Sequence, residues 1–171
     1  MTRNTTYTTR RTVVQATTGL ATTALAGCSS VTGGLGGGPE YEDTVGNTML
    51  SLSDFPEGWE RNDEKNENFD AVFVGPDGGK FVMLSSEVKD DVQAAKDKFE
   101  SMKNTNSETN EVDIGDGAYW AKRKDHARVG VRDSNLILLS VAAYQSGMEW
   151  TPDQNRGIKY ARKLLDKVSD S

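Results

Sequence analysis

The sequence predicts an α+β fold: an antiparallel sheet of about five strands with two helices packed on one face, in the order β-β-α-β-β-β-α. Three observations support this prediction. Short apolar runs form two groups, at residues 69–88 and 119–144, and turn residues separate the runs within each group. Each group is followed by a stretch whose apolar residues recur at helical spacing, at residues 92–102 and 158–168. Two hairpin groups that each lead into a helix are typical of an antiparallel sheet with helices packed against it.

The first hairpin is predicted from three consecutive segments. Residues 69–74 and 80–88 are rich in β-branched and aromatic side chains, and residues 75–79 between them are turn formers. Ahead of the hairpin, a proline and a glycine force a turn in residues 54–59, whose two aromatic side chains, Phe55 and Trp59, we expect to dock on the core. The folded part therefore begins near residue 49.

The first helix is expected to start at Asp90 or Asp91, because an aspartate side chain caps the free N–H groups of a first helical turn. Four apolar residues then recur at i, i+3, i+7 and i+10 and form one helical stripe: Val92, Ala95, Phe99 and Met102. The helix is expected to end in the polar run of residues 104–110.

Three closely spaced strands are predicted next, at residues 119–124, 127–132 and 136–144. Short turns at residues 125–126 and 133–135 join them. The third strand is apolar on both faces, which predicts that it is the central strand of the sheet.

The final helix has the clearest start signal in the domain. Thr151 is a candidate N-cap, Pro152 suits the first helical position, and Gln154 completes a capping box. The buried stripe of this helix is predicted to consist of Ile158, Ala161, Leu165 and Val168.

Residues 1–27 have the features of a twin-arginine export signal. Arg10 and Arg11 form the arginine pair, and a weakly apolar stretch follows them. A lipobox comes next, in which the final thiol takes a lipid: Leu25-Ala26-Gly27-Cys28. The stretch is too short and too polar for a spanning helix, which needs about 20 apolar residues. The alternative is a threonine-rich terminus that contains an arginine pair by coincidence.

The rest of the chain divides into a tether and a domain. Residues 28–47 are expected to form a flexible tether that starts at the lipidated cysteine, because their glycine-rich and acidic composition cannot bury enough apolar surface. Residues 48–171 then form a single extracellular α+β domain, which is long enough to have its own core.

The arginine pair and the lipobox together resemble those of the twin-arginine-exported lipoproteins that are common in haloarchaea. The resemblance covers the first 28 residues. It implies that a lipid on Cys28 anchors the protein to the outer face of the cytoplasmic membrane, at the cell surface. It implies no activity.

About the last 120 residues resemble small extracellular domains of bacterial lipoproteins and of receptor-kinase sensor regions. The matching segments are residues 55–59, 115–119 and 132–136, together with the terminal helix. The resemblance implies an α+β sheet domain, and it carries over no catalytic residue.

Composition narrows the classes of function. The net charge is −6, and removing the three arginines of residues 1–27 leaves −9, the opposite of the balance that binds nucleic acid. The acid excess also suits a high-salt habitat, although the eleven lysines count against strong salt adaptation. Cys28 is the only cysteine and His126 the only histidine. An internal disulfide, a cysteine-rich zinc site and a two-histidine zinc motif therefore cannot form within one chain.

No nucleophile elbow, P-loop or dinucleotide-binding glycine motif is present. His126 is expected to be an exposed residue of a hairpin turn. Glu111, Asp113 and Asp116 offer the oxygen ligands that calcium prefers, but their spacing does not match an EF-hand loop. We therefore expect neither a metal nor a cofactor.

A basic cluster is predicted on the last strands. If residues 125–126 form a two-residue turn, Arg123 pairs with Arg128 and Tyr119 pairs with Arg132, all on one strand face. Opposed like charges cost stability, so such a face favours contact with an anion or an acidic partner. The alternative is an exposed face that the chain's own Asp and Glu neutralise.

These observations lead to an expected function. We expect a non-enzymatic binding or sensing module of unknown ligand, anchored to the membrane through Cys28 and facing an unknown surface or secreted partner. The alternative is an enzyme, or an accessory subunit of a membrane transport complex, with an active site that the sequence does not reveal.

Overall fold

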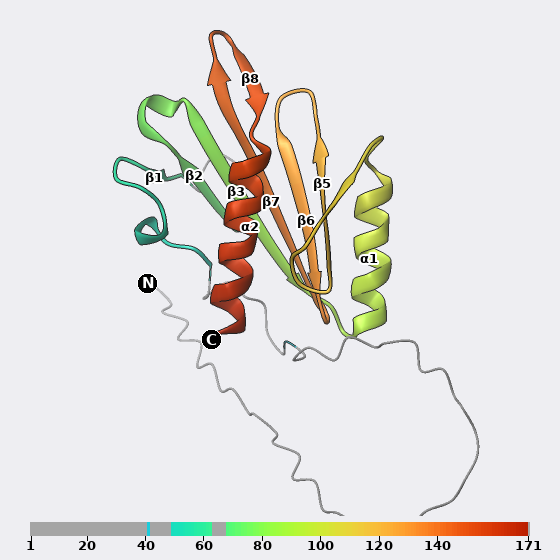
Figure 1. Cartoon of the computed structure of the whole chain (residues 1–171). Coiled ribbons are helices and arrows are strands. Elements are labelled where there is room, and N and C mark those ends of the chain that lie inside the picture. Colours follow the sequence, from blue (N-terminus) through green and yellow to red (C-terminus); the bar gives the residue numbers. More distant parts are fainter. Residues whose placement is uncertain (1–40, 42–48, 63–67, 171) are drawn as a thin grey trace, which may run out of the picture. The chain divides into compact units, whose positions relative to one another are not determined.

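The computed structural model describes residue 41, residues 49–62 and residues 68–170 (Figure 1). The predictions for Arg10, Arg11 and Cys28 lie outside the described residues, and so does the predicted tether except for Tyr41.

Eight strands, two helices and two short 3-10 helices make up the described domain. In chain order they are η2 (Leu52–Asp54), β1 (Glu60–Arg61), β2 (Ala71–Val74), η4 (Pro76–Gly78), β3 (Lys80–Val88), α1 (Val92–Asn104), β4 (Asn110–Val112), β5 (Gly117–Lys122), β6 (Ala127–Asp133), β7 (Leu136–Ser146), β8 (Glu149–Pro152) and α2 (Gln154–Ser169). All strand pairs are antiparallel, in the order β1-β2-β3-β7-β6-β5-β4, and β8 pairs with the end of β7. The α+β class and the central position of β7 are confirmed.

The predicted number of about five strands was too low, because β1, β4 and β8 have only two to four residues each and show no alternation. The start of the last helix was also predicted wrongly. Thr151 and Pro152 end β8, and Asp153 is the N-cap of α2, where its carboxylate accepts a hydrogen bond of 3.0 Å from the Arg156 N–H. Of the two caps predicted for the first helix, Asp90 and Asp91, the structure has Asp91, which accepts a hydrogen bond of 2.7 Å from the Ala94 N–H.

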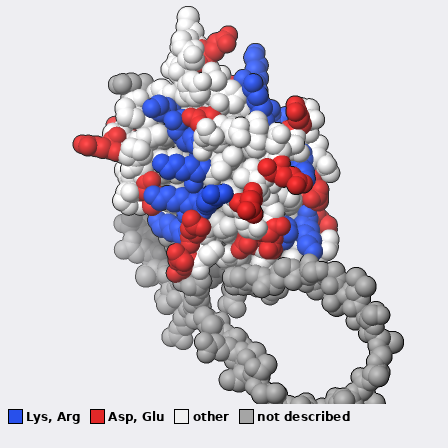
Figure 2. All heavy atoms as spheres, viewed as in Figure 1, with Lys and Arg blue, Asp and Glu red and all other residues white. Residues whose placement is uncertain are grey.

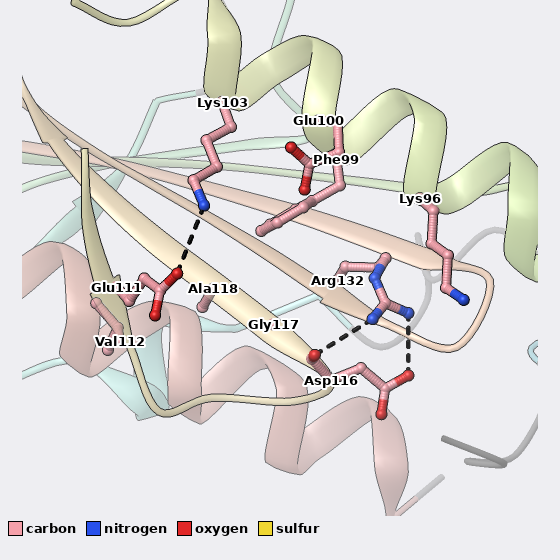
Figure 3. Close-up of a pocket in the computed structure, with 10 residues that line it drawn as sticks. All are labelled: Lys96, Phe99, Glu100, Lys103, Glu111, Val112, Asp116, Gly117, Ala118 and Arg132. Carbon is pink, nitrogen blue, oxygen red and sulfur yellow. Dashed lines mark hydrogen bonds and ion pairs between the residues drawn. The ribbon is translucent and has the colours of Figure 1, made fainter. Parts of the chain in front are cut away.

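The prediction that both helices lie on one face is wrong. Phe99 of α1 packs on Tyr119 at a centroid distance of 5.4 Å, and Tyr119 pairs with Gly130. Gly157 of α2 approaches Val129 so closely that a Cβ there would lie 3.0 Å from it. Because Val129 and Gly130 are successive residues of one strand, they point to opposite faces. The sheet therefore separates α1 from α2 (Figure 3).

The larger core lies on the α2 face, which Val129, Val131 and Leu138 share with α2. The aromatic side chain of Phe55 stacks on Phe73 at 4.1 Å and on Tyr160 of α2 at 4.2 Å. Such ring pairs add about 0.5–1.5 kcal/mol each beyond the area that they bury. The predicted docking of the residue 54–59 turn on the core is thereby confirmed.

The N-terminal segment is fastened at the β6–β7 turn. The Tyr41 N–H donates to Asn135 Oδ1 at 2.8 Å, and Asn135 Nδ2 donates back to the Tyr41 carbonyl at 2.9 Å. The Tyr41 hydroxyl donates to Asp133 Oδ2 at 2.6 Å. Burial and this hydrogen bond raise the pKa of Tyr41 to about 12, so the hydroxyl remains a donor. We call these three residues the Tyr41 latch.

The Tyr41 latch and the end of β7 lie at opposite ends of the domain. β7 starts beside the latch and runs for 11 residues. At roughly 3.3 Å per residue, its far end lies about 35 Å away. There it turns through Gly147 and Met148 into β8, at the upper end of the view in Figure 1. Among the described residues, no helix is both long enough and apolar enough to cross a membrane.

Candidate functional site

The predicted basic cluster has a different register from the one expected. The observed pairs are Gly117 with Arg132, Tyr119 with Gly130 and Ala121 with Arg128. The turn lies one residue earlier than predicted, because the Arg123 N–H donates to the His126 carbonyl at 2.9 Å and leaves Lys124 and Asp125 between the two paired residues. The register differs from the predicted one by two residues, so Tyr119, Arg128 and Arg132 still share a face.

That face is covered by α1, so the predicted open strand face is not observed. Tyr119 is fully buried. Its ring lies over Gly130, where a Cβ would approach it to 2.6 Å. Burial raises the pKa of the Tyr119 hydroxyl, while Arg128, Asn106 and Arg123 lower it. Tyr119 therefore acts as a neutral part of the core beneath α1.

The three arginines are used in different places. Arg123 donates to the Thr105 carbonyl at 2.9 Å, at the C-terminal end of α1, where the helix dipole favours a cation. Arg132 lies near the other end of α1 and donates to the Asp116 carboxylate at 3.1 Å and to the Asp116 carbonyl at 3.2 Å. Arg128 is half-buried, and its Nε has no hydrogen-bond partner within the described chain. The structure does not bring the three guanidinium groups together as one anion site.

A hollow of about 450 Å³ lies between α1 and strands β4 and β5 (Figure 3). We call it the charged groove, because six of its ten lining residues are charged. The lining consists of Lys96, Phe99, Glu100, Lys103, Glu111, Val112, Asp116, Gly117, Ala118 and Arg132. Its three cations and three carboxylates balance each other.

Two ion pairs in the charged groove differ in how firmly they are held. Lys103 Nζ and Glu111 Oε1 are 3.7 Å apart, and the Glu111 side chain is 88% exposed. Arg132 and Asp116 are 3.1 Å apart with side chains only 12% and 21% exposed. The Asp116 carboxylate also accepts the Ser134 N–H at 2.9 Å. The first pair is a surface contact, and the second is part of the β5–β6 framework.

Phe99 and Gly117 shape the floor of the groove. The Phe99 ring projects from α1 toward β5 (Figure 3). A Cβ at Gly117 would lie 3.9 Å from that ring, so the glycine keeps space open in front of it. Val112 and Ala118 complete the apolar part of the lining.

The acidic and histidine candidates from the sequence do not form one site, and of Asp113 only the backbone carbonyl accepts a hydrogen bond from the described part of the chain, donated by Arg162 Nη2 at 3.1 Å. Asp116 is paired with Arg132, and Glu111 lies near Lys103. No group of three or more metal-ligating side chains occurs within residues 41, 49–62 and 68–170. His126 lies in the β5–β6 turn as predicted, but its side chain is only 27% exposed, and its Nδ1 lies 2.7 Å from the Asp125 carboxylate.

A second basic feature runs along α2 (Figure 2). Three of its cations are paired with the chain's own acids, while Arg162 donates to the Asp113 carbonyl at 3.1 Å and Lys159 lies over the Tyr160 ring. Arg156 pairs with Asp153, and the single carboxylate of Asp54 pairs with Lys163 at 3.2 Å and with Lys167 at 3.0 Å. Lys163 and Lys167 therefore fasten η2 to α2.

The distal tip, which we define as Tyr144, Met148 and Trp150, exposes apolar side chains at the β7–β8 hairpin. Their exposed fractions are 38%, 98% and 37%. The Trp150 ring rests on Phe81 at a centroid distance of 4.9 Å. Trp150 pairs with Gln145 and Tyr144 pairs with Thr151, so the Trp150 and Tyr144 side chains point to opposite faces of the hairpin, with Met148 at its turn.

The sequence analysis did not identify Lys96, Glu100 and Lys103 as site residues, and it considered Glu111 only as a calcium ligand. The first three lie with Phe99 on one helical stripe, at i, i+3, i+4 and i+7, so helical spacing carried the signal. The distal tip was missed because residues 151–154 were interpreted as a helix start.

Comparison with known proteins adds no family. No protein-family model, curated protein or solved structure matches this chain.

Proposed function

We propose that this chain is a lipid-anchored cell-surface lipoprotein whose domain is a non-enzymatic binding or sensing module. In this proposal, twin-arginine export through Arg10 and Arg11 precedes attachment of a lipid to Cys28. The observation that carries the proposal is the arrangement of the two ends of the domain: the Tyr41 latch lies at one end, and the distal tip lies at the other.

This arrangement of the two ends supports display of the distal tip away from a membrane. Cys28 precedes Tyr41 by 13 residues. A fully extended segment of that length spans at most about 45 Å. An anchor on Cys28 therefore keeps the latch end of the domain within about 45 Å of the lipid. The distal tip, at the end of the domain opposite to the latch, is left free to meet a surface or secreted partner.

Whole-cell labelling tests the proposal. Because Cys28 is the only cysteine and its thiol is consumed by the lipid, a cysteine introduced elsewhere is the only reactive thiol. With a large, membrane-impermeant maleimide on intact cells, Met148→Cys should label rapidly. Asp170→Cys, exposed at the opposite end, should label more slowly, and the fully buried Ala121→Cys should not label.

Two results contradict the proposal. Labelling of Met148→Cys only after cell lysis excludes surface display, and faster labelling of Asp170→Cys reverses the orientation.

A second test concerns the lipid anchor, since Cys28→Ser should release the protein from membranes. Retention of that variant after a high-salt wash contradicts the lipid anchor.

A second candidate function is an accessory subunit of a membrane complex. The distal tip favours it, because Met, Trp and Tyr are side chains enriched at protein interfaces. The native protein, extracted in mild detergent, should then migrate above its monomer mass and return to monomer mass in the Met148→Ser, Trp150→Ser double variant. If the native protein without substitutions migrates at its monomer mass, this alternative is excluded.

A further inference from the structure

The charged groove has no net charge but holds six charged side chains. A ligand with only negative charge is repelled by Glu100, Glu111 and Asp116. A ligand with only positive charge is repelled by Lys96, Lys103 and Arg132. Like charges brought together in this way are unfavourable. A ligand that carries one charge of each sign is attracted by both sets.

Some of these charged side chains can turn to a ligand, and others are held by partners within the protein. The Lys103–Glu111 pair is an exposed ion pair, which contributes about 0–1 kcal/mol, so opening it costs little. Lys96 and Glu100 form no ion pair with any described residue. By contrast, the Arg132–Asp116 pair is largely buried and also holds the Ser134 backbone, so it remains closed as one wall of the groove.

From this arrangement we infer that the charged groove binds a small zwitterion with an apolar side chain, of the class of a free α-amino acid. The ligand inserts between Lys103 and Glu111: its carboxylate meets Lys103 Nζ, and its ammonium meets the Glu111 carboxylate. The apolar side chain then lies on Phe99, in the space that Gly117 leaves open. The volume of about 450 Å³ falls within the range of pockets that hold small molecules.

The inference deepens the proposed binding function by naming a ligand class, and its test does not depend on the membrane anchor. The protein for this test is the chain from residue 28 onward with Cys28→Ser, which contains the whole compact unit of residues 35–171. If labelling and membrane release behave as proposed but the groove binds nothing, only the ligand class fails.

Calorimetry with L-leucine and two matched analogues tests the inference. N-acetyl-leucine lacks the ammonium charge, and leucinamide lacks the carboxylate charge. We expect leucine to bind with a Kd of about 1 mM or lower, and each analogue to bind at least about tenfold more weakly. If no apolar amino acid binds at about 10 mM, or if an analogue binds as well as leucine, the inference is overturned.

Two groove variants locate the site. Glu111→Gln should weaken leucine binding by about tenfold or more and remove the difference between leucine and N-acetyl-leucine, because a charge-assisted contact is lost. Lys103→Gln should do the same for the difference between leucine and leucinamide. The Glu111 side chain is 88% exposed and the Lys103 side chain 29% exposed, and their ion pair is long, so thermal unfolding should change little, which separates a binding defect from misfolding.

Matched controls at exposed positions outside the groove complete the test. Lys124→Gln and Glu149→Gln remove the same charges from exposed positions outside the groove, and leucine binding should be unchanged. Equal weakening by the controls and the groove variants shows a general charge effect and overturns the assignment of the site.

Discussion

The two faces of the sheet are built for different tasks. The cluster on the α2 face contains nineteen buried apolar residues of the described chain, and the cluster on the α1 face contains five. On the α2 side, charged groups such as Asp54 are shared between elements and hold them together. On the α1 side, the Lys103–Glu111 pair is exposed and loosely held. The comparison assigns stability mainly to the α2 face and leaves the α1 face free for a groove.

The largest effect is expected from a cavity on the α2 face. Leu164 of α2 is fully buried, so Leu164→Ala should reduce the free energy of unfolding by about 2–5 kcal/mol, as measured by chemical denaturation. Met102→Ala, at a partly buried position on the α1 side, should cost about 1 kcal/mol. Equal losses at the two positions mean that both faces carry the stability equally.

A smaller effect is expected from overpacking the α1 face. A Cβ at Gly130 would lie 2.6 Å from the Tyr119 ring, so Gly130→Ala should reduce the free energy of unfolding by about 1–3 kcal/mol. In a Tyr119→Leu background the added cost should largely disappear, because the ring that clashes is gone. If the costs of the two substitutions simply add, the ring does not lie over Gly130.

The smallest effect concerns the charges that fasten η2 to α2. Although burial opposes its charge, the Ser51 N–H and the cations of Lys167 and Lys163 hold the pKa of Asp54 well below its usual 3.8. Asp54→Asn should therefore reduce the free energy of unfolding at neutral pH by about 1 kcal/mol.

The pH dependence of this difference follows from the sign of the shift. Because the pKa of Asp54 is lower in the folded protein than in the unfolded chain, the carboxylate stabilises the fold fully above pH 3.8. The difference between wild type and Asp54→Asn should shrink as the pH falls below that value, as followed by urea denaturation across pH. Asp166→Asn, an exposed change on the same helix, should show no such trend.

Much of the strand pattern could be predicted from local signals. The bounds of β3 match the prediction, and α1 begins after the predicted Asp91 cap. β1, β4 and β8 were not predictable from alternation, because strands of two to four residues are too short to show it. Their formation depends on pairing with longer neighbours.

The arrangement of helices was partly encoded in β7. Its apolar residues face both ways, and a strand buried on both faces needs cover on both. Leu138 contacts the α2 core and Ile137 the α1 core, so this alternation pointed to a helix on each side. The groove was harder to foresee, because it depends on how α1 sits over β4 and β5, which no local pattern of residues specifies.

The Tyr41 latch has a mechanical consequence for the lipid-anchored protein that we propose. A pull on the N-terminal segment reaches the domain first at Asn135, beside the start of the central strand β7. The paired hydrogen bonds between Tyr41 and Asn135 must break before tension passes to the two-residue edge strand β1. When the N-terminal segment is pulled, the latch therefore takes up the load beside β7 before the load reaches the buried Leu50 and, after it, β1.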